Sequence, residues 1–585
     1  MPPRAERSPV HGFPTRARWA LLLLAAAAAG EPGAPCPHIR FLGGEEPALS
    51  EAERRLVCGD PDSEGWKQVP LTQAKYFLKA FLQQQGYHHP RFEPKDAGLE
   101  VWIGTRTRIS GVEAEGLPPD LRLSRRRGVI GAWLTPSALD ELQAWIVKEL
   151  QSRGRGCPAV RLEADADTGR VRARVDPGPV HELVKIHEAS TGQLDPGVFR
   201  RFEAFAYGKP LDLRLLNLTA SRVVSEDLFL SAFYDLSCSS QALTVTQRVV
   251  TAPPRLVTAG VGFDSEDLAR ARVRWRNSRI GWRASRFEAI LSASQRVQSG
   301  EAELRWYPRP AARWYLQPRA EGRRENELRY EALFSEASLQ PGIDWDNQRM
   351  RLSAQVGPAL QYVRTLRGQG PADETFLALR ARLEATGHLF EYHLREPKTG
   401  WRAVFDVQSR RKGAFADFTA HRFELNAQRL WNLGNYDPPV AILGWRTVAG
   451  ATLADKESEA PGALPAPLRF FMGGDADVRG FDRKELPIGG EGYLTTHYQG
   501  LELRAGDVLP GRVQPLVFVD AAMAGRRSGE LEREIYWSPG LGVRWGSPVG
   551  ALRATAARAY TARRDPALLE HRPHWQVFFS WGQEF

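Results

Sequence analysis

Two different hydrophobic patterns divide the chain. From about residue 255 onward, apolar and polar residues alternate with the period of two that is typical of β-strands. In ARARVRWR, residues 269–276, alanine, valine and tryptophan occupy the odd positions and arginine occupies every even position. The same alternation appears in EAELRWY, residues 301–307, and in FLALRARLEA, residues 376–385. This pattern predicts a long series of strands, each with one apolar and one charged face.

A barrel accounts for these strands better than a soluble sheet does. A soluble sheet with one dry face also alternates. Here, however, the charges are dense and of both signs, and no helical pattern interrupts the series, which favours a transmembrane β-barrel with a wet lumen. Counting the segments from RLVTAGVGF to HWQVFFSWGQEF gives about 16 strands, an even number as found in bacterial barrels.

The region before the barrel has a repeating mixed pattern. VPLTQAKYFLKAFLQQQGY, residues 69–87, and TPSALDELQAWIVKELQSRG, residues 135–154, place apolar residues at helical spacing. A hairpin pattern follows each helix, and the second hairpin turns at Asp167–Gly169. The order strand, helix, helix, strand, strand recurs about every 70 residues, three times in all. The repeat predicts three small α+β modules in series.

The N-terminus has the pattern of a targeting segment. Arg16 and Arg18 precede the apolar run WALLLLAAAAAG. This predicts a signal peptide over residues 1–30, since the run is too short to span a bilayer as a helix. A disordered tail is the alternative, and a lipid anchor on Cys36 is disfavoured by the Glu-Pro that separates it from the apolar run.

Charge and cysteine content restrict the possible partners and disulfides only slightly. The net charge of +10 could favour nucleic acid, but 69 acidic residues are mixed among 79 basic ones, so an anionic lipid surface is an equal interpretation. Of the four cysteines, Cys36 and Cys58 are close enough in sequence to pair, whereas Cys157 and Cys238 have no obvious reason to meet. Free buried thiols are the alternative, because connectivity cannot be deduced from sequence.

One long loop combines glycines, aromatic residues and a single framed arginine. It contains LRFFMGGDADVRGFDRKELP, residues 468–487, between the eleventh and twelfth predicted strands. By the period of two, Glu502 and Asp520 on the next two strands point into the lumen. Arg479 could bridge both carboxylates with its planar fork of donors, while Gly473, Gly474 and Gly480 would let the loop turn and approach the wall. Phe470, Phe471 and Phe481 would pack its base. We therefore expect Arg479 to fix the loop inside the barrel; a plain surface loop is the alternative.

The last segment, WQVFFSWGQEF, places aromatic and apolar residues on one face of the final strand. These residues are Trp575, Val577, Phe579, Trp581 and the terminal Phe585. An aromatic-rich last strand ending in Phe resembles the β-signal of outer-membrane proteins. Gly582 and the polar Ser580 near its end predict incomplete pairing with the first strand, near Val257–Phe263.

The loop sequence RFFMGGDADVRGF resembles the signature of the outer-membrane assembly-factor superfamily, also called the bacterial surface antigen family. The family's loop tip, Val-Arg-Gly-Phe/Tyr, is matched by Val478, Arg479, Gly480 and Phe481. Its Phe-x-Asp-x-Gly strand motif is matched by Phe518 and Asp520, with Ala522 in place of the final glycine, and its strand-twelve glutamate more loosely by Glu502. The SPGLGVRWGSPVG segment, residues 538–550, also resembles the family.

The resemblance implies a β-barrel membrane protein with α+β modules of the POTRA type. The implied domains are the signal peptide 1–30, POTRA modules 35–106, 107–178 and 179–253, and a barrel 254–585 of about 16 strands whose sixth loop, about residues 454–493, folds inward. It places the barrel in the outer membrane and the modules in the periplasm.

Three modules resemble the TamA branch of this superfamily, the barrel subunit of the translocation and assembly module. That resemblance implies an insertase or translocase for β-barrel and autotransporter clients, which contacts outer-membrane lipid and docks a TamB-like periplasmic partner, with lipid transport as a linked role. The alternatives are a general assembly factor, a two-partner secretion transporter, a passive porin and a surface antigen. We find no catalytic motif in the sequence and expect no enzyme activity, cofactor, metal site or nucleic-acid partner.

Overall fold

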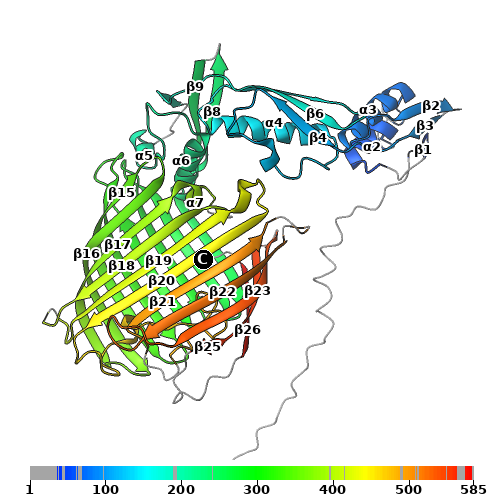
Figure 1. Cartoon of the computed structure of the whole chain (residues 1–585). Coiled ribbons are helices and arrows are strands. Elements are labelled where there is room, and N and C mark those ends of the chain that lie inside the picture. The colour runs from blue at the N-terminus through cyan, green and yellow to red at the C-terminus, as the bar shows by residue number, and fades with distance from the viewer. Residues whose placement is uncertain are drawn as a thin grey trace, which may run out of the picture. The chain divides into compact units, whose positions relative to one another are not determined.

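A computed structural model (Figure 1) describes the chain from residue 36 to residue 582. Within this span the exceptions are residues 37, 43–46, 61, 63–66, 68, 96–97, 189–193, 240–241, 394–396, 414, 488–491, 507–508, 510, 512, 548–549 and 563–573. The predicted signal peptide and Phe585 lie outside the described residues. Two compact units are distinguished by their internal contacts, and the second, which includes residues 174–585, contains the third module and the barrel.

The first module is a three-stranded sheet with two helices. Its elements are β1 (Ile39–Leu42), α2 (Glu51–Cys58), α3 (Leu71–Gln84), β2 (Arg91–Lys95) and β3 (Gly98–Trp102). The sheet order is β1-β3-β2, with β1 parallel and β2 antiparallel to the central strand. Leu78 and Leu82 of α3 are fully buried, as their helical spacing predicts. Cys36 and Cys58 form a disulfide with a Cα–Cα distance of 5.3 Å.

The second and third modules repeat this topology, so the predicted threefold repeat is confirmed. Their sheets have the orders β4-β6-β5 and β7-β9-β8. The elements of the second module are β4 (Gly111–Glu115), α4 (Pro136–Gln151), β5 (Ala159–Ala164) and β6 (Arg170–Asp176). Those of the third are β7 (Ile186–Glu188), α5 (Gly197–Arg200), α6 (Leu213–Ser225), β8 (Phe229–Ser239) and β9 (Ala242–Thr251).

One sequence prediction for the modules was wrong. The second module has only the 3-10 turn η1 (Leu123–Arg125) where the repeat predicts a first helix. The segment GLPPDLRLSRRRG contains adjacent prolines, which cannot donate helical hydrogen bonds. Cys157 and Cys238, whose pairing the sequence leaves open, form a disulfide with a Cα–Cα distance of 5.8 Å and a sequence separation of 81. This disulfide joins the segment before β5 to the end of β8, a proximity that no local pattern encodes.

The rest of the chain is a closed antiparallel barrel, β10 to β26 in sequence order. The strands β24 and β25 are separated only by Ala559 and together form one strand of the wall, so the barrel has 16 strands, in agreement with the predicted count. The first half comprises β10 (Arg255–Asp264), β11 (Leu268–Ile280), β12 (Ser285–Ser294), β13 (Val297–Arg305), β14 (Trp314–Asn326), β15 (Glu331–Asp346), β16 (Met350–Arg367) and β17 (Asp373–Gly387). The second half comprises β18 (Gly400–Arg410), β19 (Ala420–Asn432), β20 (Ala441–Ala454), β21 (Thr495–Ala505), β22 (Val513–Gly525), β23 (Ile535–Ser547), β24 (Gly550–Arg558), β25 (Tyr560–Ala562) and β26 (Trp575–Gly582).

The two faces of the barrel wall differ as the alternation predicts. On β17, Leu377 and Leu379 are exposed on the outside, whereas Arg380 forms an ion pair with the buried Glu336 of β15 inside. An apolar outer surface and a charged lumen are typical of barrels that span a membrane. Among the described residues, the structure has no helix that is both long and apolar enough to cross a membrane.

The barrel therefore has two distinct ends. We call the end next to the third module, where β10 begins, the module end, and the opposite end, where the loops after β10, β12 and β14 lie, the loop end. The short helix α7 (His388–Tyr392) follows β17 at the module end (Figure 1).

A buried charge cluster joins the third module to the barrel. Arg222 of α6 donates to both oxygens of Glu391 in α7, at 2.7 and 2.6 Å, and to Asp346 at the end of β15, at 2.7 Å. Asp346 also contacts the His388 ring, at 2.9 Å. All four side chains are largely or fully buried. A guanidinium that binds two carboxylates restricts both its distance from them and the orientation of its plane. This cluster therefore determines how α6 lies on the barrel.

We expect Arg222→Ala to release α6 from the barrel without unfolding the strands. The change leaves Asp346 and Glu391 buried without their main cation, which costs roughly 3–5 kcal/mol for a buried pair. Hydrogen–deuterium exchange of α6 and α7 should become faster, while β15 to β17 stay protected. Arg248→Ala is the matched control, because that arginine pairs with Asp235 at the exposed surface of the same module, where a pair is worth about 0–1 kcal/mol. Unchanged exchange in α7 of Arg222→Ala would contradict the anchoring role.

Candidate functional site

The loop between β20 and β21, residues 455–494, folds back into the barrel; we call it loop six. Its apolar side chains pack against the inner wall rather than facing solvent. The buried cluster contains Phe470, Met472, Val478, Phe481, Leu486 and Tyr493 from loop six with Tyr498, Ala522, Ala524, Tyr536 and Ala559 from the wall or its strand junctions. Burial of this many large side chains stabilises an inward loop through the hydrophobic effect.

Arg479 lies at the centre of this inward loop and binds two carboxylates of the wall. Its Nε donates to Asp520 Oδ2 at 2.7 Å and its Nη2 to Asp520 Oδ1 at 3.0 Å, which is a bidentate pair. Its Nη1 donates to Glu502 Oε2 at 2.8 Å, and its backbone N–H donates to Asp520 at 3.2 Å. Asp520 is fully buried and Arg479 is 3 % exposed. Removing either partner would therefore leave a buried charge unpaired.

The wall around the pair restricts its geometry further. The guanidinium carbon of Arg479 lies 3.3 Å from the centroid of the Phe518 ring, a cation–π contact. Tyr498 donates its hydroxyl to Asp520 Oδ1 at 2.9 Å and accepts from Arg446 at 2.9 Å. Asp520 thus accepts from a guanidinium, a backbone amide and a phenol. We call Arg479, Glu502, Phe518 and Asp520 the loop-six lock.

Glycines give the loop its shape, at two different kinds of position. Gly473 and Gly474 have φ of +110° and +112°, a backbone conformation that residues with a side chain rarely adopt. A Cβ on Gly480 would lie 2.7 Å from both Ser538 Cβ and Ala559 N, so this glycine permits close approach to the wall. Ala522, where the family motif has glycine, is buried against loop six, and the close approach to Phe518 is made by Gly540 of β23 instead.

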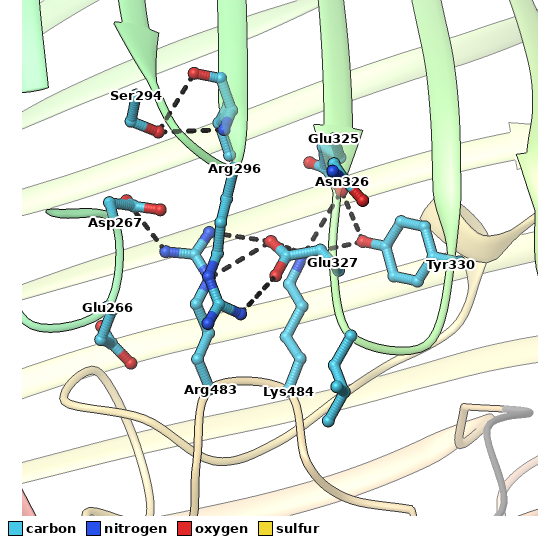
Figure 2. A network of polar contacts seen from close by, with 12 residues as sticks. Glu266, Asp267, Ser294, Arg296, Glu325, Asn326, Glu327, Tyr330, Arg483 and Lys484 are labelled. Atoms are coloured by element: carbon cyan, nitrogen blue, oxygen red, sulfur yellow. Dashed lines mark hydrogen bonds and ion pairs between the residues drawn. The ribbon is translucent and has the colours of Figure 1, made fainter. Parts of the chain in front are cut away.

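A second set of charges holds the same loop from the other side (Figure 2). Arg483 contacts Glu327, in the loop after β14, at 2.9 Å, and Asp267, in the turn after β10, at 3.0 Å. Lys484 contacts Glu327 at 3.1 Å and the Tyr330 hydroxyl at 2.7 Å. The Glu327 side chain is fully buried. We call Arg483, Lys484, Asp267 and Glu327 the second anchor.

Loop six also crosses the line where the barrel closes. The backbone N–H of Asp475 donates to Glu266, in the turn after β10, at 3.2 Å, and the Asp475 carboxylate pairs with Arg553 of β24 at 3.4 Å. Glu485 lies 3.8 Å from His574, directly before β26. Burial raises the pKa of the Glu266 carboxyl to about 7, while Arg483 and the Asp475 N–H lower it. The loop therefore contacts both sides of the β10–β26 junction.

The sequence-predicted residues fall into two groups. The first group is the loop tip, which lies in the lumen: Val478, Arg479, Gly480 and Phe481. It contacts the side chains of β21 and β22 that the alternation predicts to face the lumen. The last-strand residues Trp575, Val577, Phe579 and Trp581 share the exposed outer face of β26. The second anchor was not predicted, although the basic pair Arg483–Lys484 directly after the loop tip was a visible signal. Its carboxylates lie in short turns whose position no strand pattern specifies.

The sequence of this C-terminal region matches a known family. Residues 390–585 match the sequence model of the Omp85 superfamily domain. The match includes loop six, the lock and the last strand, and it agrees with the superfamily that the loop sequence resembles. The matched region begins within α7 and covers the second half of the barrel, β18 to β26.

Solved structures with a similar fold include a BamA from Haemophilus ducreyi lacking POTRA domains 1–3, at 14% sequence identity and a TM-score of 0.49, covering 81% of this chain and 99% of that one. CdiB from Acinetobacter baumannii has 12% identity and a TM-score of 0.46, covering 81% and 89%. CdiB from Escherichia coli has 13% identity and a TM-score of 0.44, covering 92% and 100%.

We expect Arg479→Ala to free loop six while leaving the strand ladder intact. The change removes the cation shared by Asp520 and Glu502, at a cost of roughly 3–5 kcal/mol for a buried pair, reduced to the extent that lumen water reaches Glu502. Limited proteolysis should cut loop six, and heat should unfold the barrel at a lower temperature on gels. Arg479→Lys should restore protection only in part, since an ammonium cannot bind bidentately. Lys456→Ala, an exposed change in the same loop, is the control; equal protection in Arg479→Ala and wild type would contradict the lock.

A change in the second anchor should loosen only one side of the loop. Arg483→Gln removes the contacts with Asp267 and Glu327, but Lys484 still neutralises Glu327, so we expect a cost of about 1.5–3 kcal/mol, typical of charged hydrogen bonds. Hydrogen exchange should increase in residues 482–487 and in the turn after β10, while residues 476–481 stay protected by the lock. Faster exchange throughout the loop would mean that the two anchors are not separate.

Proposed function

We propose that the protein is an outer-membrane insertase or translocase that assists the assembly or secretion of β-barrel and autotransporter clients. In this proposal the module end of the barrel faces the periplasm and loop six faces the cell exterior. The Omp85 domain supports the outer-membrane location. The TamA-like role, rather than that of a general assembly factor or a two-partner secretion transporter, is supported by the three modules that precede the barrel.

One observation carries the proposal: the barrel closes through an unusually short ladder. In the described residues, β10 and β26 share two residue pairs, Phe263 with Trp581 and Asp264 with Ser580. By comparison, β10 shares ten pairs with β11, and β24 shares eight with β26. These pairs agree with the incomplete pairing predicted near Val257–Phe263 as far as the structure describes the last strand, which ends at Gly582. Strand edges with free N–H and C=O groups can template the pairing of another strand, so this seam is where a client strand would add.

The modules supply a second pairing surface. Each of their sheets has three strands, so two of the three are edge strands, β1 and β2 in the first module. An extended segment can add to such an edge by main-chain hydrogen bonds. We propose that a TamB-like periplasmic protein docks on the modules in this way, with lipid transport as the linked role. In this proposal the barrel itself carries out no enzymatic chemistry and needs no cofactor.

A passive porin is the alternative from a different class. Two observations disfavour it: loop six is packed into the lumen, and its charges are neutralised by the wall. In planar bilayers a porin would conduct ions steadily, whereas a barrel closed by loop six should conduct little until the loop is released.

A disulfide across the seam tests the proposal. Phe263→Cys with Trp581→Cys places two thiols at directly opposed positions on β10 and β26. We expect oxidation to crosslink them and to stop the insertion of an unfolded autotransporter barrel into proteoliposomes, since the two edges can then no longer separate. Reduction should restore insertion.

The matched control keeps the same first cysteine. Phe263→Cys with Ala269→Cys places a crosslink between β10 and β11, which are paired along their length, and should leave insertion unchanged. Wild-type protein, treated with the same oxidant and reductant, controls for the two native disulfides. Complete crosslinking of the seam with undiminished insertion would overturn the proposed gating.

A further inference from the structure

The module half of the lumen contains a polar chamber that the lock does not use. Its volume is about 520 Å³. Inward-facing side chains of β12 to β18 form most of its wall. The remaining lining residues are Phe390 and Glu391 of α7 and Glu226, directly after α6. Seven arginines and four glutamates line it. The loop-six lock does not contribute to this lining.

Six of these seven arginines have a carboxylate partner within 4.0 Å. For example, Arg286 pairs with Glu226 and Glu303, and Arg402 pairs with Glu384. The same holds for Arg319, Arg351, Arg380 and Arg382. The chamber wall is therefore close to charge balance at every arginine but one.

Arg305 is the exception. Among the described residues, no carboxylate lies within 4.0 Å of its guanidinium and no hydrogen-bond acceptor contacts it, although Glu226 and Asp344 interact with it electrostatically over a longer distance. Its Nε is buried without a partner. The guanidinium lies over the Tyr315 ring, with its carbon 4.5 Å from the ring centroid, and Arg305 faces Arg286 on the adjacent strand. Like charges at opposed positions are unfavourable unless a counter-charge is present.

A second unused donor lies two strands away. The pairing of Trp306 with Leu316 places Arg305 opposite Gln317 of β14. Gln317 is paired in turn with Gln340 of β15. The amide of Gln317 donates to Glu303 at 2.7 Å, so it is engaged. Gln340, which lines the chamber, has no hydrogen bond to a described residue. Arg305 and Gln340 are thus two donor groups that flank the same space and lack acceptors.

We propose that this chamber binds a phosphate-class oxyanion, with Arg305 as its principal ligand and Gln340 as a second donor. Guanidinium groups match phosphate oxygens in charge and geometry. A phosphate would supply the directly bonded anion that Arg305 lacks among the described residues, and acceptors for both donors. The volume exceeds that of one phosphate, so the group can belong to a larger molecule: the source is either free phosphate or the phosphate ester of a lipid head group.

Equilibrium dialysis of the full chain in a maltoside detergent tests this proposal. The probes are radiolabelled inorganic phosphate and labelled glycerophosphoethanolamine, the water-soluble head group of a phospholipid, at constant ionic strength. We expect saturable binding of at least one probe, weakened about tenfold or more in Arg305→Gln, as loss of a charged hydrogen bond implies. Gln340→Leu should weaken binding less. Tighter binding of the ester identifies a head group, and tighter binding of inorganic phosphate identifies the free ion.

Arg364→Gln is the matched control, because it removes an exposed arginine at the loop end of β16 that pairs with Asp373; its affinity should stay within about twofold of wild type, as is typical for an exposed charge pair. Acetate as a competitor tests the chemical class. Displacement of phosphate by equimolar acetate would show a general carboxylate site and overturn the proposal. Absence of binding, or equal affinity in Arg305→Gln and wild type, would mean that water alone solvates Arg305. Neither readout depends on client insertion.

Discussion

The buried ion pair of Arg479 with Asp520 is the constraint on which the rest of the lumen depends. Asp520 is fully buried, and a buried carboxylate is tolerable only with a cation and hydrogen-bond donors beside it. The wall offers the Tyr498 hydroxyl and, at longer range, the Arg446 guanidinium; the cation that binds Asp520 directly comes from loop six. The loop can bring it there because Gly480 lets its backbone touch β23 and the junction at Ala559. The hydrophobic packing of Val478 and Phe481 then follows from the same inward path.

Fixing the loop at one point has a mechanical consequence for the closure of the barrel. The lock holds loop six to β21 and β22, and the second anchor holds it to the turns after β10 and β14. These attachments lie on opposite sides of the β10–β26 seam. Since the described residues of β10 and β26 share two residue pairs, the side chains of loop six add contacts where this ladder is short. Separation of β10 from β26 would then require rearrangement of loop six.

The period-two alternation was enough to predict the strands, their inner and outer faces, the even strand number and the partners of Arg479, because the face of a side chain depends only on its position along its own strand. The second anchor could not be predicted in this way. Glu327 and Asp267 lie in turns, and their distance from Arg483 is set by how the barrel closes. The Cys157–Cys238 disulfide was missed for the same reason, since it depends on the packing of separate sheets. The missing helix near Leu123 was a local error, for which the adjacent prolines were a warning.

The two halves of the lumen differ in which part of the chain neutralises their charged side chains. In the loop half, carboxylates such as Asp520 and Glu327 are neutralised by cations that loop six brings in. In the module half, no described residue of loop six lines the chamber, and six of the seven arginines of the wall have carboxylate partners on neighbouring strands or at the end of α6. Movement of loop six would thus uncover negative charge in the loop half. The third module, through Arg222 and Glu226, contributes charges to the module half alone. The two halves nevertheless adjoin, because Phe390 and Arg402 line both the chamber and the cavity beside Arg479 and Glu502.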